Sequence, residues 1–127
     1  MIVFDATGRP VVAGGSAGGG QIVDYIARAL VQLLAQGQAP DEAVAPGHLS
    51  TAQAPRVQIE AGSPRERVAA GLRARGHDVV VERMLSGLGF LRRDGAGWIG
   101  AADPRRDGVA LGLPAADSGA GGPQPAR

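Results

Sequence analysis

The chain lacks two reactive side chains altogether, because its 127 residues include no cysteine and no lysine. The absence of cysteine excludes a disulfide, a thiolate metal site and a cysteine nucleophile. All 13 basic residues are arginine, so a lysine Schiff base and the lysine of a phosphate-binding P-loop are excluded as well. These absences remove several large classes of enzyme before any motif is considered.

Aromatic residues and long apolar runs are also scarce. Aromatic residues make up 3% of the chain, so the core has to be largely aliphatic. They are Phe4, Tyr25, Phe90 and Trp98. The longest apolar stretch, residues 22–35, is interrupted by polar residues, which argues against a membrane span. The N-terminus lacks the basic and apolar segments of a signal peptide, and a net charge of +1 argues against a nucleic-acid partner.

Glycine and proline are abundant instead, with 21 and 9 residues, which is typical of many turns. Hydrophobic residues still make up 44% of the chain, enough to form the core of one small domain. Residues 113–127 are mostly Gly, Ala, Ser and Pro, and we expect them to be a disordered tail. Residues 1–112 are then the folded part.

The periodicity of apolar residues predicts a mixed α+β fold in which an antiparallel sheet packs against helices. Strands are expected at residues 2–4, 10–13, 56–60, 77–83, 88–92 and 97–100. Helices are expected at residues 21–36, 40–44 and 64–75. Turn residues join the first two strands and the last two strands, so a β-hairpin is predicted at each end of the folded part.

The helix at residues 21–36 is predicted to be mostly buried. Asp24, Arg28 and Gln32 recur every four residues and form a narrow polar stripe, and the first two are spaced to form an ion pair. Most of the remaining circumference is apolar, which is typical of a buried helix.

A glycine-rich loop, residues 14–20, joins a predicted strand to the start of this helix. The N–H groups at a helix start lack partners and favour negative charge, and glycine lets the backbone approach an anion closely. Three interpretations remain open: a phosphate cradle, an oxyanion hole, or a tight turn without a ligand. The phosphate interpretation is the weakest, because neither G-x-G-x-x-G nor a P-loop lysine can be found here.

The same loop matches the G-x-S-x-G pattern of a serine nucleophile, with Ser16 as the serine and with Asp41 and His48 following in the required order. A loop this rich in glycine matches that pattern easily, and the chain is too short for the sheet of such a hydrolase. We therefore do not expect Ser16 to be catalytic.

The other polar residues give no strong site. His48 and His77 are the two histidines, and neither has a second ligand at metal-binding spacing, so both are expected at the surface and no metal or cofactor is predicted. Residues 103–108 are dense in charge and predict a turn in which aspartates and arginines pair.

Several segments together resemble the C-terminal part of the small subunit of γ-glutamyltransferases, also called glutathione hydrolases. Residues 15–22 (GSAGGGQI) are similar to the family sequence GSPGGSRI. Residues 100–108 (GAADPRRDG) are similar to its closing motif G-A-S/A-D-P-R-R-D/E-G. Weaker similarities lie between these motifs and before them, at residues 2–8, 41–48, 72–77 and 86–88.

The resemblance implies part of an N-terminal nucleophile hydrolase, which is an αββα sandwich. In that family a threonine at the start of the small subunit attacks the γ-glutamyl carbonyl of glutathione and related amides, and water or an amino acid then takes the acyl group. Gly18 and Gly19 match the glycine pair whose N–H groups would bind the substrate oxyanion. No cofactor is implied, and members of the family are commonly periplasmic or extracellular.

The resemblance also implies that parts of the enzyme lie outside this chain. The nucleophilic threonine, a paired-serine motif that binds the substrate carboxylate, and the large subunit match no residue here. We therefore expect a fragment that is inactive alone, whose partners are the missing N-terminal segment or large subunit and, in the complete enzyme, a γ-glutamyl substrate. The alternative is a non-catalytic remnant or binding module that docks on a full-length relative or binds an anion at the glycine loop.

Overall fold

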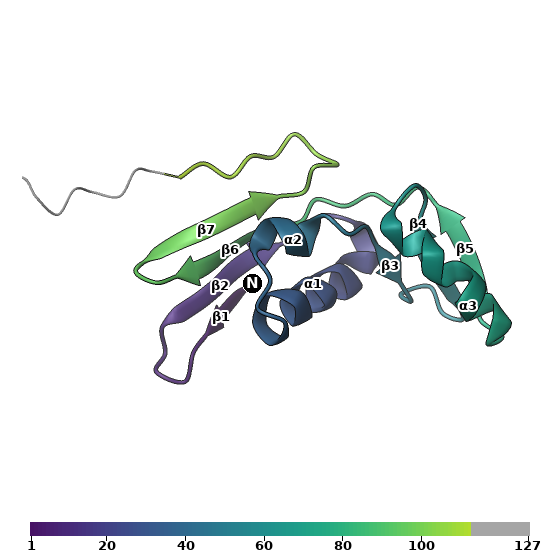
Figure 1. The fold of residues 1–127 in the computed structure, drawn as a ribbon, viewed down its shortest axis with the longest axis horizontal. Helices are drawn as coiled ribbons and strands as arrows, with labels where there is room; N and C mark the ends of the chain where they lie inside the picture. The colour runs from purple at the N-terminus through teal and green to yellow at the C-terminus, as the bar shows by residue number, and fades with distance from the viewer. Residues whose placement is uncertain (113–127) are drawn as a thin grey trace, which may run out of the picture.

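The computed structural model describes residues 1–112 and contains two sheets joined by helices (Figure 1). Sheet A is antiparallel, with strand order β1-β2-β6-β7. Its strands are β1 (Ile2–Phe4), β2 (Pro10–Gly15), β6 (Gly89–Asp94) and β7 (Gly97–Ala102). Both predicted hairpins are confirmed, and the strand at each end of the chain pairs with its immediate neighbour in sequence. The predicted tail, residues 113–127, lies outside the described residues.

Sheet B is smaller and mixed, with strand order β3-β4-β5. Its strands are β3 (Leu49–Ser50), β4 (Arg56–Glu60) and β5 (Asp78–Glu82). A 3₁₀ segment (Pro64–Val68) and α3 (Ala69–Ala74) connect β4 to β5, and these two strands are parallel because the chain crosses over through the helix. The two-residue β3 was not predicted, since so short a segment carries no alternating pattern.

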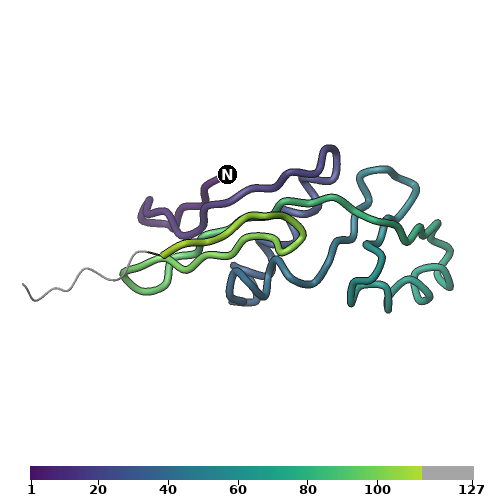
Figure 2. The backbone as a smooth tube through the Cα atoms, turned by 90° about the horizontal axis from the view of Figure 1, so that it is seen from above, coloured from purple at the N-terminus to yellow at the C-terminus, as the bar shows by residue number. Residues whose placement is uncertain are grey.

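The glycine loop leads into one long helical segment. It consists of a 3₁₀ turn (Gly19–Gln21), α1 (Ile22–Leu30) and a π-helical turn (Val31–Ala35), and is followed by α2 (Pro40–Val44). Helices α1 and α2 cover one face of sheet A, while α3 covers sheet B (Figures 1 and 2). None of the helices within residues 1–112 combines the length and apolarity that crossing a membrane requires.

The molecule has two separate cores, one for each sheet. The core of sheet A is formed by side chains of β2, β6, α1 and α2, including Val12, Tyr25, Ala29 and Phe90. The core of sheet B is formed by Val57, Ile59, Ala69 and Val79. Sheet A with α1 and α2 therefore forms one half of the molecule, and sheet B with α3 forms the other half.

The expectation that the helix at residues 21–36 is mostly buried is wrong for part of its surface. Val23, Val31 and Leu34 are 73%, 52% and 49% exposed, whereas Gln32 of the polar stripe is buried. The stripe points inward because its residues bind other elements: the carboxylate of Asp24 accepts hydrogen bonds from the hydroxyl of Ser50 and the N–H of Thr51.

The expected ion pair between Asp24 and Arg28 does not form within residues 1–112. Arg28 instead donates hydrogen bonds to His48 and Gln32. Tertiary partners have therefore replaced the local pair, which is worth little at a surface.

Candidate functional site

The glycine loop forms a tight corner between β2 and the helical segment. Gly18 has φ 144° and Gly19 has φ 63°, both in the region that favours glycine. A side chain at Gly18 would also have no room, because a Cβ atom there would lie 2.7 Å from Cε2 of Tyr25 and 3.0 Å from the carbonyl oxygen of Leu85. The conformation of this corner therefore requires glycine.

The N–H groups of Gly18 and Gly19 lie at the start of the helical segment, where no intrahelical partner exists. Within residues 1–112, neither of them donates a hydrogen bond to the backbone or to a side chain. They also lie at the positive end of the helix dipole. Two free donors at this position can bind an anion or an oxygen on which negative charge develops.

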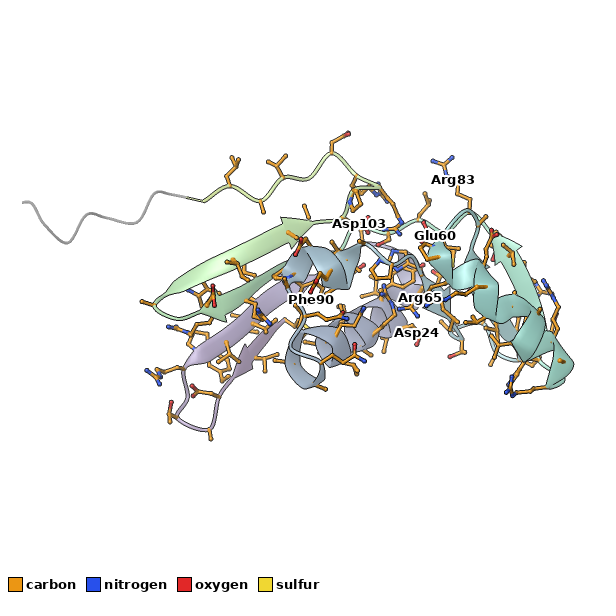
Figure 3. All side chains as sticks on the ribbon, in the orientation of Figure 1. Asp24, Glu60, Arg65, Arg83, Phe90 and Asp103 are labelled. Atoms are coloured by element: carbon orange, nitrogen blue, oxygen red, sulfur yellow. The ribbon has the colours of Figure 1, made fainter. Side chains whose placement is uncertain are left out.

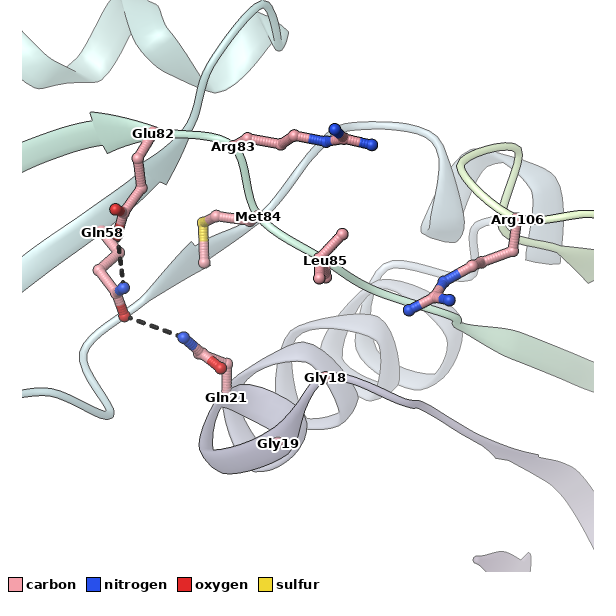
Figure 4. Close-up of a pocket in the computed structure, with 9 residues that line it drawn as sticks. All are labelled: Gly18, Gly19, Gln21, Gln58, Glu82, Arg83, Met84, Leu85 and Arg106. Atoms are coloured by element: carbon pink, nitrogen blue, oxygen red, sulfur yellow. Dashed lines mark hydrogen bonds between the residues drawn. The ribbon is translucent and has the colours of Figure 1, made fainter.

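These glycines open into a cavity of about 490 Å³ (Figure 4). It is lined by Gly18, Gly19, Gln21, Gln58, Glu82, Arg83, Met84, Leu85 and Arg106. On one side a row of hydrogen bonds forms the wall: Nε2 of Gln21 donates to Oε1 of Gln58 (3.3 Å), whose own Nε2 donates to Glu82 (2.6 Å). The cavity therefore lies between the start of the helical segment and sheet B, to which Gln58 of β4 and Glu82 of β5 belong.

A serine hydrolase site is not formed. The hydroxyl of Ser16 donates to the carbonyl oxygen of the next residue, Asp41 is exposed, and His48 is fully buried. No hydrogen bond within residues 1–112 joins any two of these three residues. The G-x-S-x-G match is thus the chance result of a glycine-rich loop.

His48 is the centre of a buried polar cluster, so the expectation that it lies at the surface is wrong. Its ring is 0% exposed and packs against the ring of Tyr25, with 4.0 Å between the centroids. Nη2 of Arg28 lies 3.1 Å from Nδ1 of His48. Arginine can only donate, so Nδ1 is the acceptor and the ring proton is on Nε2, which faces Oδ2 of Asp103 at 3.5 Å. By contrast, His77 is exposed, as predicted.

The environment of the cluster fixes the charge of its members. Burial, with the guanidinium groups of Arg28 and Arg105, lowers the pKa of His48 from 6.5 to about 4, so the ring is neutral near pH 7. Burial alone would raise the pKa of Asp103. Hydrogen bonds from Ser86 and Arg105 outweigh burial and hold the pKa of this carboxyl at about 2.

The charged segment at residues 103–108 forms the predicted turn, and Asp103 pairs with Arg105 there, with 2.8 Å between Oδ1 and Nη1. The pairing extends beyond the turn. Arg105 also binds the carboxylate of Glu60, and Nε of Arg106 donates to the carbonyl oxygen of Ser86. Asp103 and Glu60 lie near the junction of the two halves (Figure 3). Because Arg105 pairs with both carboxylates, it connects the turn that follows β7 to the end of β4.

Sequence reasoning identified Gly18 and Gly19 but missed the other residues of the cavity. Gln58, Glu82 and Leu85 are far from the loop in sequence, and no spacing rule connects them to it. Arg106 belongs to the charged segment at residues 103–108, for which the sequence predicts a turn and which is part of the motif that resembles the family's closing motif.

The sequence model of the gamma-glutamyltranspeptidase family matches residues 1–113. The chain belongs to this family. Comparison with curated protein sequences gave no significant match.

Solved structures of the gamma-glutamyltranspeptidase family share the fold. The enzyme of Pseudomonas nitroreducens complexed with L-DON superposes with a TM-score of 0.78 at 23% identity, covering 90% of this chain and 61% of that chain. The T380A mutant of the Helicobacter pylori enzyme gives 0.72 at 20% identity, with coverage of 84% and 59%. The Bacillus anthracis transpeptidase CapD gives 0.66 at 19% identity, with coverage of 80% and 63%.

The predicted fold class is thereby confirmed: the chain has the mixed α+β arrangement of these N-terminal nucleophile hydrolases. It spans about three fifths of the chains it resembles, 61% in the Pseudomonas enzyme.

Proposed function

We propose that this chain is the C-terminal portion of the small subunit of a γ-glutamyltransferase or glutathione hydrolase, in which Gly18 and Gly19 form the oxyanion hole. One observation carries the proposal: in the fold of this family, a cavity of about 490 Å³ is lined by Gly18 and Gly19, whose N–H groups lie at a helix start and have no partner within residues 1–112. Both donors are backbone groups of a tightly packed corner, so they need little reorganisation when charge develops.

The chemistry is acyl transfer. A threonine hydroxyl attacks the γ-glutamyl carbonyl, its proton passes to the threonine's own amine, and the carbonyl oxygen becomes negative. The N–H groups of Gly18 and Gly19 stabilise that oxygen, and collapse of the intermediate expels the leaving amine, which takes up a proton. Water or an amino acid then attacks the ester, and the same two donors stabilise the second oxyanion.

The nucleophile comes from another segment in this proposal. The hydroxyl of Thr7 donates to the carboxylate of Asp5 in an exposed turn, and Thr51 follows β3 in a loop. Neither threonine lines the cavity beside Gly18. The chain thus contributes stabilisation of the oxyanion, while the threonine and the groups that bind the substrate carboxylate are supplied by the rest of the enzyme.

Sheet A supports a partner of this kind. One face packs on α1 and α2, whereas the row formed by Ile2, Ala13, Leu91 and Gly100 crosses all four strands on the opposite face. Ile2, Leu91 and Trp98 are 59%, 47% and 41% exposed. Exposed apolar side chains that gather on one face of a sheet are typical of a docking surface, and we assign this face to the second sheet of the αββα sandwich, supplied by the missing segment and the large subunit.

The test is a chimera in which residues 1–112 replace the superposed part of the Pseudomonas nitroreducens enzyme, assayed by release of p-nitroaniline from a γ-glutamyl anilide. We expect turnover by the chimera and none by the 127-residue chain alone. Gly18→Ala in the chimera keeps the N–H group but has no room for the new Cβ atom, so the loop and its two donors should be displaced. We expect kcat to fall by about 10²-fold or more, as when an oxyanion-hole donor is lost.

Gly62 offers a matched control, since it also has a positive φ (72°) but lies outside the cavity. Gly62→Ala should leave kcat near that of the parent chimera. A chimera that folds and still fails to release p-nitroaniline, or equal turnover by the Gly18→Ala variant, would rule the proposal out.

A further inference from the structure

Gly18 lies close to two groups that come from different elements, and we call these two groups the clamp. They are the ring of Tyr25 in α1 and the carbonyl oxygen of Leu85, in the segment between β5 and β6, and both lie next to the position that a Cβ atom of Gly18 would take. Both are so close that a Cβ atom on Gly18 would overlap them, at 2.7 Å and 3.0 Å. The backbone of Gly18 therefore has no room to move toward either group, and this restricts the positions that its N–H group can take.

The Tyr25 side of this clamp is fixed from behind by His48. The two rings are 1% and 0% exposed, and they pack with centroids 4.0 Å apart and an angle of 33° between their planes. His48 is itself immobilised: Arg28 donates to its ring at 3.1 Å, and its backbone N–H donates to Glu60 at 2.8 Å. Tyr25 therefore has no free space into which its ring could turn away from Gly18.

The Leu85 side is fixed by Asp103. The hydroxyl of Ser86, the next residue, donates to Oδ2 of Asp103 at 2.6 Å, and Ser86 is 1% exposed. Nε of Arg106 donates to the carbonyl oxygen of Ser86 at 2.6 Å. The two sides meet where Nε2 of His48 faces the same Asp103 oxygen at 3.5 Å. One buried cluster thus supports both sides of the clamp.

We infer that Tyr25 is a positioning residue for the oxyanion hole: its ring, fixed by His48, holds the N–H groups of Gly18 and Gly19 in the orientation that catalysis needs. The inference rests on the proposed function, since positioning matters only if these donors meet an oxyanion. Donors stabilise a transition state only when they are already placed within hydrogen-bond distance of the developing charge. A loop of three consecutive glycines cannot hold such a position by its own stiffness, so the rigidity has to come from side chains packed against it.

The test uses three substitutions of Tyr25 in the ¹⁵N-labelled 127-residue chain. Tyr25→Leu removes the ring, Tyr25→Met fills the space with a flexible chain, and Tyr25→Phe keeps the ring. We expect the amide resonances of Gly18 and Gly19 to shift and broaden in the Leu variant, less so in the Met variant, and to stay near their original positions in the Phe variant. Leu33→Ala, in the same core but remote from the loop, controls for general loosening.

The kinetic readout uses the chimera described above. Tyr25→Leu should lower kcat by about 10-fold to 100-fold, less than the loss of a whole donor, with little change in KM. Tyr25→Phe should keep kcat near that of the parent chimera, because the Tyr25 hydroxyl forms no hydrogen bond within residues 1–112. If Tyr25 acted only through the packing of the core, Leu33→Ala should lower kcat as much as Tyr25→Leu does.

The outcomes separate the two proposals. Unchanged Gly18 and Gly19 resonances in both Tyr25→Leu and Tyr25→Met would overturn the positioning role, whatever the chimera does. If Tyr25→Leu fails to fold, Tyr25→Met decides by the same criterion. Displaced resonances together with a chimera that is inactive even with Tyr25 in place would leave the clamp intact and reject the proposed function.

Discussion

Between pH 6.5 and 4, acid should destabilise this protein through His48. Its ring is fully buried, and Nδ1 already accepts a hydrogen bond from Arg28, so a second ring proton would point at a guanidinium group. Burial and this neighbour lower the pKa of His48 from 6.5 to about 4. The unfolded chain therefore binds a proton below pH 6.5, whereas the folded protein does not bind it until about pH 4.

The sign and the size of the effect follow from this difference. Since the unfolded state binds the extra proton, the free energy of unfolding falls as the pH falls from 6.5 to 4. One pKa unit corresponds to about 1.4 kcal/mol, so the loss should reach about 3 kcal/mol at pH 4. Asp103 does not change the free energy of unfolding in this range. Its pKa is lowered from 3.8 to about 2, so the stability that its carboxylate contributes is lost only as the pH falls from 3.8 toward 2.

Urea unfolding followed by circular dichroism at intervals between pH 7.5 and 4 measures the effect. In the His48→Gln variant the free energy of unfolding should change little between pH 6.5 and 4. The His77→Gln variant, with the same change at the exposed histidine, should show the same pH dependence of the free energy of unfolding as the original chain. A slope that survives His48→Gln, or that disappears with His77→Gln, would refute the assignment of the proton to His48.

Three other substitutions test particular contacts. Gly18→Ala should lower the free energy of unfolding by roughly 2–4 kcal/mol, because the φ of 144° and the ring of Tyr25 both oppose a side chain. Gly15→Ala, where the Cβ position is open, is the control in urea unfolding, and equal losses in the two variants would contradict the close packing around Gly18. Ser86→Ala removes a buried hydroxyl donor 2.6 Å from Asp103 and should lower the free energy of unfolding by about 1–3 kcal/mol. A urea midpoint equal to that of the original chain would show that this hydrogen bond does not stabilise the fold. Ser16→Ala should leave kcat/KM of the chimera unchanged, and a large fall would restore the serine nucleophile that the structure argues against.

The elements predicted correctly are those with a strong local signal. The hairpins have alternating strands and turn residues, and β4 has a clear alternation from Arg56 to Glu60. The glycine loop was located from the run of glycines between a predicted strand and a predicted helix, although this pattern alone left open whether the loop binds a ligand. Such features depend on residues adjacent in sequence, so one chain is enough to recognise them.

The elements that escaped prediction depend on tertiary partners. Whether Asp24 and Arg28 face water or the interior is decided by Ser50 and His48, which are more than 15 residues away. His48 has no metal-binding companion in the sequence, and its burial follows from Tyr25 and Asp103 meeting around it. A polar stripe on an apolar helix is therefore ambiguous in sequence: it marks either the solvent side or the side that meets a buried polar cluster.

The most direct measurement of the proposed role is a crystal structure of the chimera complexed with L-DON, the ligand of the Pseudomonas relative. The account predicts that the ligand oxygen at the reacting carbon accepts hydrogen bonds from the N–H groups of both Gly18 and Gly19, at roughly 2.7–3.1 Å. An oxygen bound by other donors, with these two N–H groups facing solvent, would contradict it.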